Sequence, residues 1–178
     1  SKKTMFLAQR LYENGHITYM RTDSVNLSAE STAAAKKWLE QNLGTNYSSE
    51  APRAFKAKSK LAQEAHEAIR PTDPENTPEK IALADLGEKK LYELVWRRFM
   101  ASQMPTAKIS TTTIEIFAGT KNPMPTGRQE ELKTSAKGGS ASGGKTYTLK
   151  ATGQQILFDG YLKIWPQKLE EKELPELK

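Results

Sequence analysis

The chain has no cysteine among its 178 residues, and it has only two histidines. Disulfide bonds, thiol catalysis and cysteine-built zinc sites are therefore excluded, and a histidine-built metal site is hard to assemble. Long apolar runs are also missing, since stretches such as Leu94-Val95-Trp96 fall far short of the ~20 residues that cross a bilayer. We expect no secretory signal, because Ser1-Lys2-Lys3 leads directly into a helical pattern. These absences favour a cytoplasmic protein that has no membrane partner.

Positively charged residues only moderately outnumber negatively charged ones. The 27 Lys and Arg residues stand against 21 Asp and Glu residues, which gives a formal net charge of +6. The excess is evenly spread, at +3 in residues 1–100 and +3 in residues 101–178. Such a balance is typical of a solvated surface, and it indicates only weakly a polyanionic partner such as a nucleic acid.

The beginning of the chain carries two helical patterns. Residues 4–14 are expected to form a helix that Gly15 ends, since glycine is the usual residue just after a helix. Ser28 is a typical N-cap, and it opens a second expected helix that Gly44 ends. Between the two, residues 16–20 contain β-forming side chains and are expected to be extended.

Prolines punctuate the next part of the chain. A short helical pattern over residues 61–69 must end before Pro71, because a residue that precedes proline avoids the helical conformation. Thr77-Pro78 is typical of a helix opening, and we expect that helix to continue to near Gly87. A stronger pattern covers residues 88–103. Its expected buried face carries Leu91, Val95 and Phe99.

The remaining residues indicate strands. Residues 107–117 are rich in β-branched side chains and predict a strand. Two more strands are expected over residues 146–150 and 155–165, with a turn or bulge at Asp159-Gly160. The composition of residues 118–145 predicts a flexible loop. Because helices come first and strands second, we expect an α+β fold with two segregated parts.

The densest group of reactive side chains lies between residues 17 and 24. If this segment is extended, Tyr19, Arg21 and Asp23 share one side, because side chains alternate along an extended chain. A tyrosine can act as a covalent nucleophile, and a neighbouring arginine favours its phenolate and binds phosphodiester oxygens. The same pattern also fits a half-buried strand with a surface ion pair. The residues alone leave both interpretations open.

A second group of candidate residues lies at residues 63–71. On a helix, His66 and Arg70 are four positions apart and project together, which suits a phosphate clamp. The alternative interpretation is a surface helix in which Glu67 pairs with a lysine.

Basic residues and one aromatic residue follow one another between positions 53 and 60. The run consists of Arg53, Phe55, Lys56, Lys58 and Lys60. It could bind a nucleic acid, with bases stacked on the phenylalanine ring. More often, such a run is a solvated loop.

Three blocks of the sequence together resemble a known family. Residues 7–13, 17–24 and 63–71 read LAQRLYE, ITYMRTDS and QEAHEAIRP, and they are similar in order and spacing to bacterial type IA DNA topoisomerases. The stretches around Trp96 and Phe158 also fit this family. Met20 after the tyrosine is similar to the topoisomerase I branch, whereas proline is usual in the topoisomerase III branch.

The resemblance implies that these residues belong to an enzyme that relaxes negatively supercoiled DNA without ATP. Tyr19 would cleave single-stranded DNA, hold its 5′ phosphate as a phosphotyrosine, and allow the free 3′ hydroxyl to reseal the break after strand passage. Arg21 would stabilise the phenolate and the reacting phosphate, and His66 would contact a backbone phosphate nearby. Supporting or DNA-binding roles would belong to Thr18, Thr22, Asp23, Glu67, Arg70, Lys56 and Lys58.

The resemblance also implies an arrangement of domains. Residues 1–105 would form a helical, helix-turn-helix-like domain of the winged-helix or CAP-like type, and residues 106–178 would form part of a β-rich arch. Magnesium would be bound by a toprim domain that this sequence lacks, so we expect no metal ligands here and no plasmid relaxation by this fragment alone. The partners would be single-stranded DNA and the other domains of a monomeric, nucleoid-associated cytoplasmic enzyme.

Hypotheses from other classes compete with this one. A DNA-binding module without chemistry would use Tyr19 only to stack on a base, and a purely structural α+β domain would not bind DNA at all. A tyrosine recombinase is disfavoured, because its tyrosine follows its arginine and histidine residues, whereas Tyr19 precedes His66 and Arg70. Covalent trapping of DNA on Tyr19 separates the enzyme from the binding module.

Overall fold

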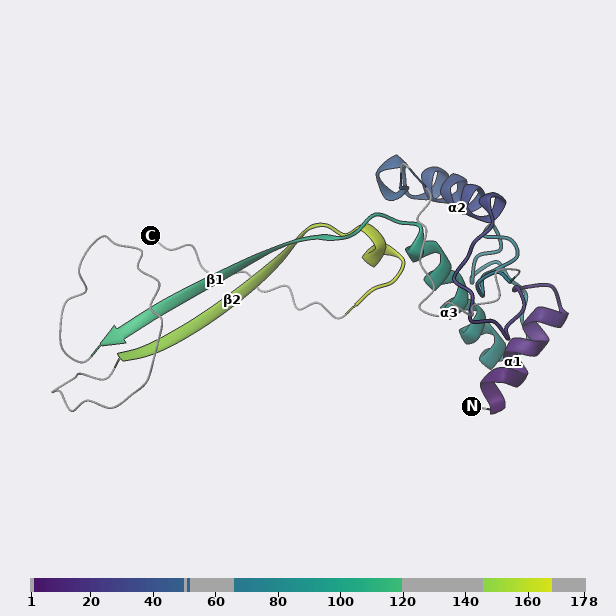
Figure 1. Ribbon diagram of the computed structural model, residues 1–178, viewed down its shortest axis with the longest axis horizontal. Helices are drawn as coiled ribbons and strands as arrows, with labels where there is room; N and C mark the ends of the chain where they lie inside the picture. The colour runs from purple at the N-terminus through teal and green to yellow at the C-terminus, as the bar shows by residue number, and fades with distance from the viewer. Residues whose placement is uncertain (1, 50, 52–65, 120–145, 168–178) are drawn as a thin grey trace. The chain divides into compact units, whose positions relative to one another are not determined.

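The computed structural model describes residues 2–49, 51, 66–119 and 146–167 (Figure 1). Its elements are, in chain order, α1 (Lys2–Glu13), α2 (Ala29–Asn42), the 3-10 helix η1 (Thr45–Tyr47), α3 (Leu86–Ser102), β1 (Lys108–Gly119), β2 (Thr146–Phe158) and the 3-10 helix η2 (Gly160–Lys163). Helices together with a two-stranded antiparallel sheet confirm the expected mixed α+β class. None of the described helices is long and apolar enough to cross a membrane.

The chain forms two compact units. Residues 1–108 and 156–169 belong to the first unit, and residues 109–155 and 170–178 belong to the second. The end of β2 and η2 therefore pack with the helices, whereas the expected division after residue 105 grouped them with the strands. As a statement about domains, that division stays a prediction.

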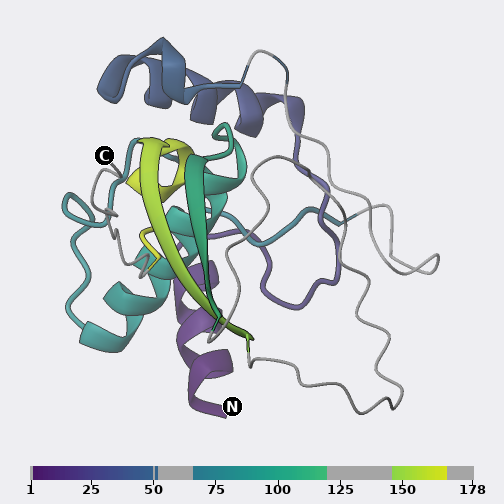
Figure 2. The same cartoon turned by 90° about the vertical axis from the view of Figure 1, so that its left-hand side faces the viewer.

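The core of the first unit is built by α1, α2 and α3. Figures 1 and 2 show α1 alongside α3. Leu11 of α1 is fully buried, and the rings of Trp38 and Trp96 meet edge to face at 5.0 Å between α2 and α3. Complete burial of one such large side chain contributes about 1.5–3 kcal/mol. The same cluster contains Ile17 and Met20, so the core also anchors the segment that carries Tyr19.

Side-chain caps determine where the longer helices begin. Ser28 accepts a hydrogen bond from an N–H group of the first turn of α2 at 3.2 Å, which confirms the expected cap. α3 begins two residues earlier than expected, because Asp85 accepts from the N–H groups of Glu88 and Gly87 at 3.0 and 2.6 Å. These two hydrogen bonds lower the pKa of Asp85. The sequence signal was an aspartate followed three residues later by glutamate.

The buried face of α3 differs from the expected one. Tyr92 and Trp96 are buried in the core, Leu91 and Val95 only flank it, and Phe99 alone confirms the expectation. The two aromatic side chains are larger, and their polar atoms donate to main-chain carbonyl groups before α3 at 2.6 and 3.0 Å. Burial, together with a nearby carboxylate, raises the pKa of Tyr92 to about 12.

Two expected helices are absent from the described residues. Of the helix expected over residues 61–69, residues 61–65 lie outside the described residues. Residues 66–69 are not helical, because residues 70 and 71, which follow them, pair with Thr18 and Ile17 instead. After Thr77-Pro78 the chain makes only a turn, in which the N–H of Ile81 bonds to the carbonyl of Thr77 at 3.0 Å. Ile81 and Leu83 both pack against the core, and a spacing of two residues suits an extended chain rather than a helix.

The two strands form a ribbon. β1 confirms the strand expected over residues 107–117, whereas β2 is one continuous strand where two were expected. Glu115 and Lys150 form a salt bridge at 2.5 Å between the strands. Of the loop expected over residues 118–145, the first two belong to β1 and 120–145 lie outside the described residues.

The turn after β2 is confirmed at Asp159-Gly160, but it leads into η2 rather than into more strand. Gly160 has a positive φ of 49°, and a Cβ there would come within 2.7 Å of the carbonyl oxygen of Pro105. The close approach therefore requires glycine. Tyr47 donates a hydrogen bond to the Asp159 carboxylate at 2.8 Å, and this bond raises the pKa of Tyr47.

Candidate functional site

The two segments singled out in the sequence lie side by side. Ile17 and Pro71 form an antiparallel bridge, and the N–H of Thr18 donates to the carbonyl of Arg70 at 2.9 Å. The Thr18 hydroxyl adds a second link, since it donates to the carbonyl of Ala68 at 2.8 Å and accepts from the N–H of Arg70 at 2.9 Å. Segments 50 residues apart in sequence are thereby fastened together immediately before Tyr19.

A pocket with three aromatic rings results from this pairing. The ring of Tyr19 meets Tyr12 at 5.2 Å between centroids, with an interplanar angle of 68°, and lies 6.4 Å from His66. The pocket measures about 390 Å³ and carries Tyr12, Gly15, Ile17, Thr18, Tyr19, His66, Glu67 and Thr72 along its walls. The tyrosine and the histidine of the two sequence motifs therefore share one site.

The segment after Tyr19 alternates between exposed and buried side chains. Tyr19, Arg21 and Asp23 are exposed, whereas Met20 and Ser24 are buried. This alternation matches the expectation for an extended chain with its polar side chains on one side. Within the described residues, no ion pair joins Arg21 to Asp23, so both charges face solvent beside the tyrosine.

Thr22 is half-buried, and its hydroxyl stabilises a local turn of the main chain. Its hydroxyl accepts from the N–H of Ser24 at 3.0 Å, and the Ser24 hydroxyl accepts in turn from the N–H of Asn26 at 3.1 Å. These bonds replace the regular pairing that this stretch lacks. The structure thus gives Thr22 a local supporting contact. Lys56 and Lys58 lie outside the described residues, and their roles stay predictions.

Residues 66–70 are not helical, so His66 and Arg70 do not project together from one helix face as the phosphate-clamp interpretation assumed. Arg70 instead forms a salt bridge with Glu67 at 2.6 Å, and its side chain is only 14% exposed. The other carboxylate oxygen of Glu67 accepts from the N–H of Ser28 at 2.8 Å. Glu67 and Arg70 therefore attach the His66 segment to the start of α2, and Glu67 pairs with an arginine rather than the lysine considered from the sequence.

The pKa of Glu67 reflects these contacts. Burial alone would raise it, but the hydrogen bonds from Arg70 and Ser28 outweigh burial and lower the pKa below its usual range. A carboxylate whose pKa is lower in the folded state stabilises that state above its unfolded pKa of about 4.3. The stabilisation is then lost as the pH falls through the lower folded value.

We therefore expect Glu67→Gln to reduce the pH dependence of stability. The new amide side chain would keep an oxygen for the Ser28 N–H but would lose the charge that pairs with Arg70. At pH 7 the variant should be less stable by about 1 kcal/mol, and this difference should shrink as the pH falls below the unfolded pKa of about 4.3 toward the lower folded pKa. Urea unfolding between pH 3 and 7 measures this difference. If the difference in unfolding free energy between wild type and variant stayed the same from pH of about 3 to 7, the pairing of Glu67 with Arg70 would be contradicted.

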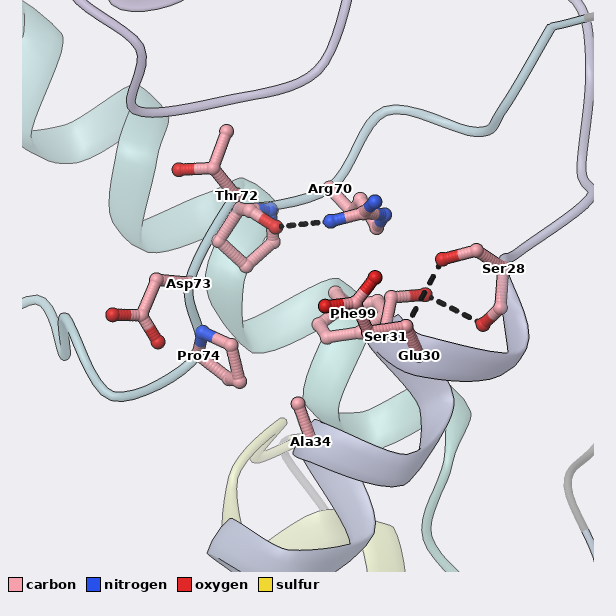
Figure 3. Close-up of a pocket in the computed structure, with 10 residues that line it drawn as sticks. Ser28, Glu30, Ser31, Ala34, Arg70, Thr72, Asp73, Pro74 and Phe99 are labelled. Atoms are coloured by element: carbon pink, nitrogen blue, oxygen red, sulfur yellow. Dashed lines mark hydrogen bonds between the residues drawn. The ribbon is translucent and has the colours of Figure 1, made fainter.

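A second pocket lies between the start of α2 and residues 70–74 (Figure 3). It measures about 330 Å³, and Phe99 of α3 contributes to its wall. Figure 3 shows Arg70 hydrogen-bonded beside Thr72, at 3.0 Å to the Pro71 carbonyl, and the Ser28 and Ser31 bonds that begin α2. Glu30 and Asp73 also line it, so their negative charges offset that of Arg70 and weaken the attraction for a phosphate.

Sequence reasoning missed two polar side chains that line the pocket. Tyr12 belongs to the last turn of α1, and Thr72 closes the pocket by donating from its hydroxyl to the carbonyl of Gly15 at 2.7 Å. The signal for Tyr12 was its position just before Gly15, where the chain reverses toward Tyr19. No comparable signal pointed to Thr72.

Comparison with known proteins identifies one family. The family model for DNA topoisomerase matches residues 1–178. DNA topoisomerase 1 of Haemophilus influenzae is 40% identical over 99% of this chain and 18% of its own length. The enzyme of the same name from Mycolicibacterium smegmatis is 42% identical over 96% of this chain and 16% of its own length. DNA topoisomerase 1 of Escherichia coli is 39% identical over 93% of this chain and 16% of its own length.

A solved structure also matches the chain. The full-length topoisomerase I of Thermotoga maritima superimposes with a TM-score of 0.70 and 32% identity, over 99% of this chain and 25% of that one. The chain belongs to the DNA topoisomerase family, and the expected resemblance to bacterial DNA topoisomerase I is confirmed. It spans less than a fifth of the length of the curated relatives named above.

Proposed function

We propose that residues 1–178 carry the strand-cleaving tyrosine of a type IA DNA topoisomerase, and that this tyrosine is Tyr19. One observation carries the proposal: the Thr18 hydrogen bonds bring two distant motifs together so that Tyr19 and His66 line one pocket. Membership of the DNA topoisomerase family supports the reaction class. Relaxation of negatively supercoiled DNA would belong to the complete protein.

The proposed reaction exchanges one phosphodiester for another. The Tyr19 oxygen attacks a phosphorus atom of single-stranded DNA, and the phenol loses its proton. The bond from phosphorus to the 3′ oxygen breaks, the 5′ phosphate stays on the tyrosine, and the 3′ oxygen takes up a proton. After strand passage the 3′ hydroxyl attacks the phosphotyrosine and reverses each step. Because the covalent bond retains the energy of the broken one, no ATP is required.

Arg21 is proposed to stabilise the charge that develops on the phosphate. It is two residues from Tyr19 along an alternating segment, it is exposed, and no described residue neutralises it. Arg21 is therefore free to present its guanidinium to two phosphate oxygens. Asp23 would orient Arg21 or contact the DNA backbone, Thr18 and Thr22 would hold the segment, and His66 would contact a neighbouring phosphate.

Magnesium enters this proposal only through the complete protein. The described residues contain no group of three or more His, Asp or Glu side chains that could hold a metal ion. They therefore do not fit a magnesium site, and no step above passes through the ion. A toprim domain as the magnesium site, other domains as partners, a monomeric state and a location at the nucleoid are all parts of the proposal.

A DNA-binding module without chemistry is the second candidate. The exposed rings of Tyr12 and Tyr19, at 42% and 41%, favour it, because exposed aromatic rings stack on unpaired bases. Both functions predict DNA binding, and only the topoisomerase predicts a covalent adduct. Adduct formation by the complete protein therefore decides between them.

Binding of single-stranded DNA should weaken steeply with salt. Each phosphate that a basic side chain neutralises contributes about −0.7 to the slope of log K against log salt concentration. Arg21→Gln should therefore make the slope shallower by about 0.7. Fluorescence titration of a labelled oligonucleotide at several salt concentrations measures the slope. The matched control is Arg97→Gln on α3, where Arg97 pairs with Glu93, and equal slopes for all three proteins would contradict the role of Arg21.

His66→Ala should reduce adduct formation less than changes at Tyr19 or Arg21. A phosphate contact positions the strand but does not take part in bond exchange, so we expect a loss of roughly 10-fold or less, expressed mainly as weaker oligonucleotide binding. Adduct yield as a function of oligonucleotide concentration separates the two effects. A loss that persists at saturating oligonucleotide and exceeds that of Arg21→Lys would reverse the proposed order.

A further inference from the structure

The ring of Tyr12 is the described aromatic side chain nearest to Tyr19. The two centroids are 5.2 Å apart and the planes meet at 68°, which is an edge-to-face contact. Tyr12 and Tyr19 are exposed by 42% and 41%, and neither hydroxyl bonds to a described residue. Among the described residues of α1, Tyr12 therefore restrains the orientation of the Tyr19 ring through this ring contact.

Tyr12 is held on a rigid element. Leu7 and Leu11 are buried, so the helix that carries Tyr12 cannot rotate. The end of α1 is also fixed: the N–H of Gly15 donates to the carbonyl of Tyr12 at 2.9 Å, and that of His16 to Leu11 at 2.8 Å. This pair of bonds is a Schellman motif, and the positive φ of Gly15, 73°, completes it.

Tyr19 has much less support. It lies outside regular secondary structure, and only its neighbours Thr18 and Met20 are fastened, one by hydrogen bonds and the other by burial. An exposed tyrosine on such a backbone can occupy several staggered rotamers. A ring carried on the fixed backbone of α1 favours the Tyr19 rotamer in which the two rings meet edge to face.

We propose that Tyr12 is a positioning residue, whose ring holds the ring of Tyr19 in the orientation from which its oxygen attacks DNA. This inference rests on the proposed function of Tyr19. The strength of an edge-to-face pair corresponds to a change in rotamer population of about 2- to 10-fold. Loss of the Tyr12 ring should slow adduct formation by that factor. Binding of the oligonucleotide should not change, because the restraint acts on the nucleophile.

The test uses the complete protein in a single-turnover assay with saturating single-stranded oligonucleotide and magnesium. Tyr12→Leu and Tyr12→Met remove the ring at an exposed position, and both should lower the rate constant for adduct formation about 2- to 10-fold, with unchanged oligonucleotide Kd and unchanged Tm. Tyr12→Phe keeps the ring and should restore the rate. Two ring-free variants guard against a folding defect in one of them.

Three results would overturn the positioning role. Wild-type rates in both ring-free variants would show that the ring contact does not matter. A higher Kd with an unchanged rate at saturation would make Tyr12 a DNA contact instead. A Tyr12→Phe variant as slow as the ring-free ones would assign the effect to the hydroxyl. Failure of the proposed function looks different, because then the wild-type protein forms no adduct, or Tyr19→Phe still forms one.

Discussion

Tyr19→Phe should abolish the covalent adduct in the complete protein, with a loss of more than about 1,000-fold, comparable to the removal of other enzymatic nucleophiles. The phenylalanine ring preserves the contacts with Tyr12 and His66, so the pocket should keep its shape. The attacking oxygen is gone, and no other described side chain in the pocket occupies its position. The yield of protein–DNA adduct on a short single-stranded oligonucleotide, with magnesium present, measures the effect.

Folding and binding controls make this result specific. The Tyr19 hydroxyl bonds to no described residue, so its removal should change the free energy of unfolding by less than about 0.5 kcal/mol. Oligonucleotide affinity should stay close to that of the wild type. Tyr147→Phe is the matched control, since Tyr147 is an exposed tyrosine of β2 far along the chain from the site, and it should form adducts normally. Adducts on the Tyr19→Phe protein would refute the assignment of the nucleophile.

Arg21→Lys should lower adduct formation by about 10- to 100-fold, although the charge is retained. Loss of one donor to a developing charge costs about 100- to 1,000-fold in other enzymes, and lysine would recover only part of it. Lysine is a compact point charge, and it cannot offer the planar fork of arginine to two phosphate oxygens. The rate constant at saturating oligonucleotide is the relevant measurement, because affinity depends mainly on charge.

The same conservative change elsewhere provides the control for Arg21. Arg97→Lys on α3 affects an exposed residue that pairs with Glu93, and it should leave adduct formation unchanged. Arg21 is exposed and unpaired among the described residues, so the variant should fold normally. Full activity of Arg21→Lys would mean that charge alone is needed at this position, or that the guanidinium does not touch the phosphate.

Local signals predicted much of the helical part. Gly15 and Ser28 indicated the end of α1 and the start of α2, because a positive φ and a capping hydroxyl are properties of single residues. The face of α3 was less predictable. Leu91 and Val95 fit the apolar pattern, but Tyr92 and Trp96 are buried because carbonyl groups from the preceding segment satisfy their polar atoms. That condition depends on the tertiary structure.

The candidate site shows the same limit more clearly. Tyr19 and His66 were found from their motifs, yet a helix at residues 61–69 was the wrong prediction for the described part of that segment. The helical pattern there is outweighed by hydrogen bonds between this segment and Thr18, which lies 50 residues before Ala68. The two side chains of His66 and Arg70 therefore do not project together from a helix, as the pattern suggested. The resemblance implied that His66 lies near the reacting phosphate, but only the structure shows the contact between the His66 and Tyr19 rings.

The most direct test of Tyr19 as the nucleophile is the chemistry of the trapped adduct. The complete protein is incubated with one oligonucleotide labelled at either its 5′ or its 3′ end, denatured, and digested so that the modified peptide can be identified by mass spectrometry. The mechanism predicts that only the 3′-end label stays with the protein, since the 5′ phosphate of the downstream fragment is bound, and that the peptide contains phosphorylated Tyr19. A retained 5′-end label, or attachment at any other residue, would contradict it.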